Sequence, residues 1–408
     1  MICAATMSAF RKSRRPFEIF GGLVTLLVFF ASMNSSADEP NVLSEPTPQW
    51  TFGDGATLAP ILSYDLIRTN FSGEHGRLAN AEKGTFNHVG LYVSKPGTYE
   101  ISIYYSLLNR QWRDAFVKMQ TSAYTSYDFG SLRLGEGKIP LDFEKNTSST
   151  QTSFIEYSTA SQAVFESYRI GVQWSWHREH ALIDAGYYGD NLEGSNPGHT
   201  WALHGAWVPI NLPGDVLHLG LARSVEYPEG RTDESGVAGP ATASFKAAPS
   251  VMLEDVSLES SGTLENVKSI QRTSLEGLWI DGPVSCQAEY LGARTAFSTS
   301  NPNYDIHGRY AFASWVLTGE SRRYDDGVVQ NVIPEHASGA VELVLRYSSV
   351  NLNDWPVPGG WERDWTAGVN WYYGRHLRLQ ANYTRTQADR RHLFLDPATF
   401  EMRLELFM

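Results

Sequence analysis

The sequence is poor in cysteine, in charge and in long apolar runs, and each shortage excludes a class of protein. It has 2 cysteines in 408 residues, so disulfides cannot form the framework of the fold. Charged residues make up 19% of the chain, below the roughly 25% of an average soluble domain. Beyond residues 1–40 no segment approaches the run of about 18 apolar residues that a transmembrane helix needs, which excludes a helical membrane protein.

The N-terminal segment has the three parts of a secretory signal peptide. A basic region at residues 11–15 precedes an apolar stretch at residues 20–31, and small residues at 35–37 offer a cleavage site. The apolar stretch is too short to span a bilayer. We therefore expect residues 1–37 to be a signal peptide that is removed on export.

Removal of this segment leaves an acidic protein. Residues 1–37 carry four basic residues and one acidic residue, so the formal net charge changes from -12 to -15. Cys286 is then the one cysteine that remains. A strongly negative chain without a basic stripe is unsuited to nucleic acid, and we expect no nucleic-acid partner.

The rest of the sequence consists of short segments in which residues of two kinds alternate. In residues 169–177, for example, Ile170, Val172, Trp174 and Trp176 share one face of an extended chain. About 16 such segments occur, with no sustained helical periodicity between them, so we predict an all-β fold. The segments are 60–70, 85–94, 98–107, 114–123, 128–138, 169–177, 180–189, 200–209, 215–225, 270–281, 283–294, 304–317, 337–348, 364–373, 375–386 and 400–408.

Short and long connections alternate between these segments, which is typical of outer-membrane barrels. Residues 139–168 and 226–269 are long connections, for example, whereas Gly282 and Gly374 mark tight turns. Residues 318–336 should form a short turn by this rhythm and do not. Either a strand is miscounted there or one periplasmic turn is long.

The last segment has one wholly apolar face. Residues 400, 402, 404, 406 and 408 are all apolar and alternate with residues that are mostly charged. At the edge of a soluble sandwich this face would promote aggregation, whereas in a closed barrel it contacts lipid. We predict a lead-in segment at residues 38–59 and a transmembrane antiparallel β-barrel of about 16 strands at residues 60–408.

Several motifs make the chain resemble the phosphate-selective porin O and P family. Residues 130–144, GSLRLGEGKIPLDFE, match the place where a strand of that family ends in Gly-x-x-Lys and opens a long loop, and residues 169–172, RIGV, resemble the re-entry into the next strand. Further matches in the same order are QAEY at 287–290, LTGESR at 317–322, LRYS at 345–348, LND at 352–354 and WTAGVNWY at 365–372.

The resemblance implies a porin of the outer membrane. Its expected architecture is a homotrimer of 16-stranded barrels, each with a third outer loop that folds inward and narrows the pore. The expected partners are outer-membrane lipid and the small anions or polar solutes in transit, phosphate among them. No cofactor is expected.

Basic residues around the long loop are the candidates for the pore. We expect the constriction to be formed by Lys138, Lys145, Arg169 and Arg133. From strand parity we assign to the pore lumen Asn87, His88, Arg272, Arg309, Arg346 and Arg378. Members of the family commonly carry adjacent arginines after a Phe on an early strand, where this chain has Phe86-Asn87-His88. The predicted lumen also has as many acidic as basic residues, so we expect weak ion selectivity.

Two other functions stay open at this point. An outer-membrane enzyme would need a nucleophile, a base and an orienting group at one end of the barrel, and no Gly-x-Ser-x-Gly signature is present. A structural barrel without an open pore is the second alternative. We expect no enzymatic activity. We also expect no metal site, because His177 and His180 lie in a tight turn without further ligands nearby in sequence.

Overall fold

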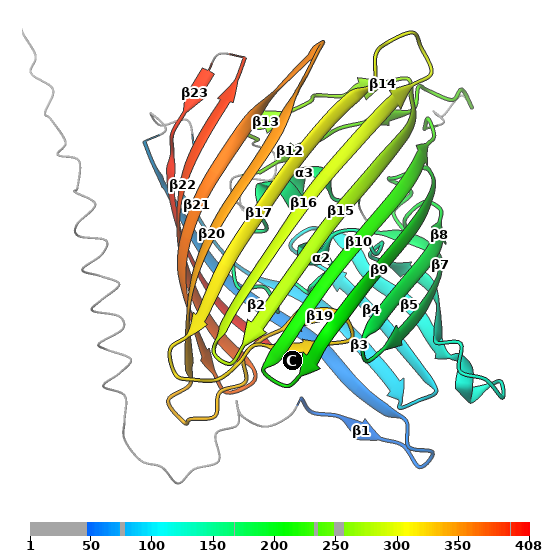
Figure 1. Cartoon of the computed structure of the whole chain (residues 1–408), viewed down its shortest axis with the longest axis vertical. Helices are drawn as coiled ribbons and strands as arrows, with labels where there is room; N and C mark the ends of the chain where they lie inside the picture. Colours follow the sequence, from blue (N-terminus) through cyan, green and yellow to red (C-terminus); the bar gives the residue numbers. More distant parts are fainter. Residues whose placement is uncertain (1–46, 74–77, 167, 232–235, 249–256, 392) are drawn as a thin grey trace, which may run out of the picture.

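The described part of the chain forms a closed antiparallel β-barrel in the computed structural model (Figure 1). The described residues are 47–73, 78–166, 168–231, 236–248, 257–391 and 393–408. The expected signal peptide, residues 1–37, lies outside them. Among the described residues no helix is long and apolar enough to cross a membrane.

Within these residues sixteen long strands pair in sequence order, and the last pairs with the first. The barrel strands are β2 (Thr57–Ser72), β3 (Ala81–Lys95), β4 (Tyr99–Ser106), β5 (Gln111–Gln120), β6 (Ser131–Gly137), β7 (Arg169–Arg178), β8 (Ala181–Tyr188), β9 (Gly198–Leu212), β10 (Asp215–Pro228), β15 (Val267–Asp281), β16 (Val284–Phe297), β17 (Tyr304–Val316), β20 (Ala340–Asp354), β21 (Val357–Tyr373), β22 (Leu377–Arg390) and β24 (Ala398–Phe407). Each overlaps one of the predicted segments, although some bounds differ by several residues, so the all-β prediction and the strand number are confirmed.

Shorter helices and strands make up the rest of the described secondary structure. They are β1 (Trp50–Thr51), η2 (Thr121–Ala123), α2 (Phe143–Asn146), α3 (Thr159–Val164), β11 (Thr242–Ala243), β12 (Lys246–Ala247), β13 (Glu259–Ser260), β14 (Leu264–Glu265), β18 (Arg323–Asp325), β19 (Val328–Gln330) and β23 (Leu393–Leu395).

The two faces of the wall invert the pattern of a soluble protein. Polar side chains such as Thr200 and Glu289 are buried on the inner face. Large apolar side chains such as Leu221, Leu275 and Trp279 are exposed on the outer face. This arrangement fits a wall whose outside meets lipid.

The final strand closes the barrel. β24 pairs with β2 from Ala398 opposite Ser72 to Phe407 opposite Ser63. Leu62 and Met408 then exchange two backbone hydrogen bonds of 2.9 and 2.8 Å. Since every strand of the ring has two neighbours, the wall presents no unpaired edge.

The long connection between β6 and β7 folds into the barrel, where it carries α2 and α3 (Figure 1). Ala160 and Val164 of α3 pack against Ile306 of β17 and Val350 of β20. Gly308 allows this close approach, because a Cβ at that position would lie 2.8 Å from the Cβ of Ala160. The prediction of an inward-folded third loop is therefore confirmed. We call residues 138–168 the constriction loop.

The connection between β17 and β20 is a long turn, and no barrel strand is miscounted there. It contains the short hairpin formed by β18 and β19. Val329 of this hairpin packs in a cluster with Phe143 of the constriction loop and Leu182 of β8. The turn thus folds back into the barrel, and we call residues 318–336 the inner turn.

Candidate functional site

A cavity of about 770 Å³ lies mainly along the inner face of strands β3 to β9 and extends to β2 and to the ends of β21, β22 and β24. The constriction loop and the inner turn complete its wall. The charged residues and histidines that line the cavity are His88, Glu100, Asp114, Lys118, Arg133, Lys138, His177, Asp184, His204, Arg323, Asp326, Arg375 and His376. The cavity therefore has a wall of mixed charge.

The constriction loop lies against the opposite side of the barrel. The guanidinium of Arg346 donates to Glu144 Oε1 at 3.0 Å, and that of Arg378 donates to the carbonyl of Thr152 at 2.8 Å. The backbone N–H of Ile155 donates to Asn382 Oδ1 at 2.8 Å. Because the loop fills the side next to β20 and β22, most of the open space lies on the side of β3 to β9, although the cavity also reaches Ser63 of β2 and Arg375 and His376 in the turn between β21 and β22.

Lys138 is the first residue after β6, at the start of the constriction loop, and its side chain lines the cavity. Its ammonium donates to the carbonyl oxygens of Lys145 and Thr147, the latter at 3.1 Å. Burial lowers the pKa of Lys138 to about 7, against the opposing effect of the Asp114 carboxylate. Lys138 therefore gains and loses its charge close to neutral pH.

Lys145 belongs to α2 and points into an aromatic environment. Its ammonium lies 3.9 Å from the ring centre of Tyr157 and 5.2 Å from that of Phe165. Burial lowers its pKa to about 8, while the carboxylate of Asp142 acts in the other direction. Lys145 is not among the residues that line the cavity.

Arg133 lines the cavity from β6. It donates to the carbonyl of Lys138 at 2.7 Å and to Gln173 Oε1 at 2.8 Å. Its guanidinium also lies over the ring of Phe116 at 5.4 Å. Arg133 and Lys138 are therefore the two predicted constriction residues that face the open space together.

The structure corrects the expected role of Arg169. Its side chain is completely buried, with Nε 2.7 Å from Glu166 and Nη2 2.5 Å from Glu226. Arg272, a predicted lumen residue, contacts the same two carboxylates at 3.1 and 2.7 Å. These two arginines hold the end of the constriction loop to β10 and β15 and do not line the cavity.

Arg309 was expected in the lumen and lies on the outer face. The even-numbered residues of β17, from Tyr304 to Val316, are buried on the inner face. The odd-numbered residues, Arg309 among them, are exposed on the outer face. Because side chains alternate strictly along a strand, Arg309 and Tyr310 cannot share a face.

Arg346 and Arg378 are on the inner face, but both are committed to fixed contacts. The guanidinium of Arg378 is fully buried and lies 2.5 Å from Glu405, and it also donates to Asn331 of the inner turn at 3.1 Å. Arg346 lies over the ring of Phe154 at 4.3 Å. Both arginines hold the constriction loop in place.

Asn87 and His88 are buried on the inner side of β3. Asn87 donates to Asp65 Oδ2 at 2.8 Å. The Nδ1 atom of His88 lies 3.0 Å from the hydroxyl of Ser63, and its ring packs edge-on against Tyr104. His88 contributes to the cavity wall, whereas Asn87 does not.

Several cavity residues were missed by sequence reasoning. Asp114 and Lys118 are four residues apart on β5 and therefore share its inner face, so strand parity could have identified both. Arg323 and Asp326 lie in the inner turn. They were missed because the alternation of polar and apolar residues gives no sign that this turn folds into the barrel. His177 of β7 was also missed, and its Nε2 atom lies 3.0 Å from the Oδ1 atom of Asp184 on β8.

Comparison with known proteins points to one family. The model of the family described as phosphate-selective porin O and P matches residues 96–407. Porin O of Pseudomonas aeruginosa is 26% identical to this chain over 353 residues, which cover 78% of this chain and 80% of that protein. These findings indicate a channel rather than an enzyme.

Solved structures of similar fold are also outer-membrane proteins. The anion-selective porin from Comamonas acidovorans gives a TM-score of 0.52 at 12% identity, covering 86% of this chain and 99% of that one. The outer-membrane channel DcaP of Acinetobacter baumannii gives 0.54 at 9% identity, covering 88% and 99%. The trimer form of OmpT of Vibrio cholerae gives 0.55 at 10% identity, covering 86% and 99%. At these identities the likeness concerns the fold. The family match decides the assignment: this chain belongs to the phosphate-selective porin O and P family and is an outer-membrane porin.

Proposed function

We propose that the cavity along β3 to β9 is part of the water-filled passage and favours small anions weakly over cations. The observation that carries this proposal is the composition of its wall. Five basic residues, Lys118, Arg133, Lys138, Arg323 and Arg375, stand beside four acidic ones, Glu100, Asp114, Asp184 and Asp326. A nearly balanced ring of charges orients polar solutes and gives a small preference between ions.

Phosphate is one of the anions that we propose can pass. The names of the family and of the anion-selective relative support an anionic solute. A tight phosphate site, however, requires clustered permanent cations that compensate for removing water from the ion. Asn87 and His88 stand where the family commonly has adjacent arginines, so we propose weak passage of phosphate without high-affinity binding.

Single-channel recording in a planar bilayer tests this function. We expect current steps of defined size. Under a potassium chloride gradient we expect a small reversal potential whose sign shows that chloride passes more readily than potassium. The Arg133→Glu variant should move the reversal potential toward cation preference. Block of the chloride current by millimolar phosphate would contradict the proposed weak phosphate passage. A barrel without an open pore, whether structural or enzymatic, would give no steps.

We also propose that the mature chain is a homotrimer in outer-membrane lipid after residues 1–37 are removed. The apolar outer face supports contact with lipid, and the trimer form of OmpT supports the assembly. Mass measurement of the detergent-extracted protein should give three chains per particle, and N-terminal sequencing should begin near residue 38. A monomeric mass would contradict the trimer.

A further inference from the structure

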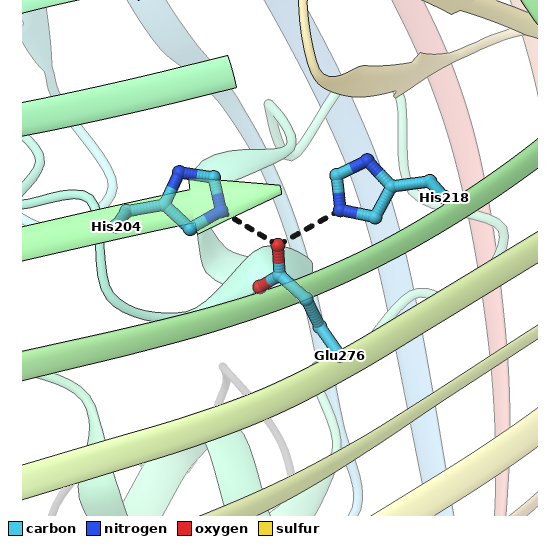
Figure 2. Close-up of side chains that lie close together, drawn as sticks. All are labelled: His204, His218 and Glu276. Carbon is cyan, nitrogen blue, oxygen red and sulfur yellow. Dashed lines mark hydrogen bonds and ion pairs between the residues drawn. The ribbon is translucent and has the colours of Figure 1, made fainter. Parts of the chain in front are cut away.

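Two histidines and a glutamate from three adjacent strands converge on the inner wall (Figure 2). His204 belongs to β9, His218 to β10 and Glu276 to β15. The Oε1 atom of Glu276 lies 2.8 Å from Nε2 of His204 and 2.9 Å from Nε2 of His218. All three potential ligand atoms lie within 4.8 Å of one another. We call these three residues the imidazole cluster.

The second nitrogen of each ring is held from outside the cluster. Nδ1 of His204 lies 3.0 Å from Asp184 Oδ2, and Nδ1 of His218 lies 2.7 Å from the hydroxyl of Tyr324. Metal-binding histidines have this arrangement, because an oxygen partner at the far nitrogen fixes the ring and directs the near nitrogen at the metal. The ring of Phe143 also stacks on His218 with centres 4.8 Å apart.

The local backbone leaves room around the carboxylate. Gly220 pairs directly with Glu276 across β10 and β15. A Cβ at Gly220 would lie 2.4 Å from Glu276 Oε1, so a side chain here would displace the carboxylate from the two imidazoles. His204 lines the cavity, which gives an ion a route from the pore to an otherwise buried position.

We propose that the imidazole cluster binds a divalent transition-metal ion of the Zn²⁺ class. Two imidazole nitrogens and one carboxylate oxygen are a known ligand set for Zn²⁺, and water from the cavity can take the remaining position. His204 has a carboxylate at each ring nitrogen, so both nitrogens donate, and a metal ion bound at Nε2 replaces one proton, which is released to solution. The Nδ1 proton of His204 stays on its hydrogen bond to Asp184, and Glu276 keeps its negative charge.

The position of the cluster gives the ion a structural consequence. Phe143 belongs to the constriction loop and Tyr324 to the inner turn, and both contact His218. A bound ion would fix the ring of His218 to the barrel wall. Because Phe143 and Tyr324 contact that ring, the ion would also stabilise the positions of the constriction loop and the inner turn. This proposal does not depend on which solute passes through the pore.

The experiment uses the folded, metal-free porin in detergent without an oligohistidine tag. Co²⁺ is the first probe, because its visible absorption reports nitrogen coordination, and Zn²⁺ is then titrated calorimetrically in two buffers of different ionisation enthalpy. We expect saturation at one ion per chain, displacement of Co²⁺ by Zn²⁺, and proton release. Absence of saturable binding by the wild type overturns the proposal and leaves a cluster held by protons alone.

Variants then locate the ion. His218→Gln and Gly220→Ala should weaken binding strongly, the second while keeping all three ligands. Tyr324→Phe should weaken it by roughly tenfold, as expected for loss of a partner that orients a ligand. His180→Gln, at an exposed turn, is the matched control and should bind like the wild type. Equal affinity of the wild type and folded His218→Gln or Gly220→Ala would place the ion elsewhere and overturn the assignment.

Discussion

Buried arginines hold the constriction loop against the barrel wall. Arg378 contacts Glu405 of β24, the carbonyl oxygens of Thr152 and Ser149 in the loop, and Asn331 of the inner turn. One guanidinium thus joins three segments. Arg378 and Glu405 are both fully buried, so removing Arg378 leaves the Glu405 carboxylate in the interior with the longer contact of 3.9 Å to Arg403.

The Arg378→Met variant should be destabilised by about 3–5 kcal/mol, the usual effect of breaking a buried ion pair. The free energy of unfolding can be measured by urea titration of the barrel folded into lipid vesicles. We also expect a larger and noisier single-channel conductance, because the loop loses its anchor. The double variant Arg378→Met with Glu405→Gln should recover part of the stability but keep the altered conductance. Wild-type stability of Arg378→Met would contradict this role.

Lys138 should make ion selectivity depend on pH near neutrality. With its pKa lowered to about 7, the amine is protonated below that pH and neutral above it. Asp114, Asp142, Arg113 and Lys145 are the charged groups that act on it. Anion preference, measured as reversal potential, should therefore increase as the pH falls from about 8.5 to about 5.5.

Protonation of carboxylates in the wall acts in the same direction, so variants must separate the two effects. Lys138→Met should reduce the pH dependence while leaving the value at high pH nearly unchanged. Arg133→Met is the control, because arginine keeps its charge throughout this range and its loss should lower anion preference at both ends. If Lys138→Met retained the full pH dependence, carboxylates alone would be responsible.

At the scale of elements, the lumen is narrowed by two segments that enter from opposite ends. The constriction loop enters between β6 and β7, and the inner turn enters between β17 and β20. They meet where the N–H of Asn331 donates to Gln151 Oε1 at 2.6 Å and where Arg322 contacts Ser153. Each segment therefore supports the position of the other.

Deleting residues 147–152 should raise single-channel conductance, because this stretch carries several contacts between the constriction loop and the inner turn, among them those of Thr150 and Gln151 with Asn331. Deleting the hairpin at residues 323–330 should also raise it, since Arg323, Asp326 and Val328 line the cavity. The two deletions together should exceed either one. Replacing residues 298–303, in the exposed connection between β16 and β17, with a Gly-Ser linker of equal length serves as the control. Unchanged conductance in a folded 147–152 deletion would place this stretch outside the conducting path.

At the scale of the whole molecule, the outer surface must match the bilayer. Leu221 lies in the middle of β10 with its side chain exposed on the outer face, while Leu212 is at the end of β9 beside a short turn. The hydrocarbon core is least tolerant of charge at its centre and more tolerant near the headgroups.

Leu221→Arg should therefore destabilise the barrel by about 2–4 kcal/mol in vesicles, and Leu212→Arg by about 0–1 kcal/mol. Urea titration of both variants in the same lipid measures the difference. Equal destabilisation would mean either that the two positions lie at the same depth or that a neighbouring chain of the trimer covers one of them.

The alternating pattern of the sequence determined the barrel. Strand number, closure by the last strand and the long third loop all follow from local features: a period of two, turn residues, and one unusually long connection. These features depend on neighbours along the chain and can be recognised without knowing the fold. From the sequence, the inner turn was recognised only as an unexpectedly long connection where a short turn was predicted. Its inward fold could not be predicted, because an irregular turn has no alternating pattern of polar and apolar residues.

Tertiary structure decided which charges reach the pore. Arg309 was placed on the wrong face because the inner face of β17 is unusually apolar: Ile306 packs on Ala160 and Val164, and Phe312 on Phe154, all in the constriction loop. Where the inner face is apolar, the rule that polar side chains of a barrel strand point inward gives the wrong phase. Arg169 is neutralised by Glu226, 57 residues away, and Arg378 by Glu405, 27 residues away. Arg378 also donates to the backbone carbonyl of Thr152, 226 residues away. The imidazole cluster likewise joins His204 to Glu276, 72 residues away, because strands that are neighbours in the closed sheet are separated along the chain by a long loop.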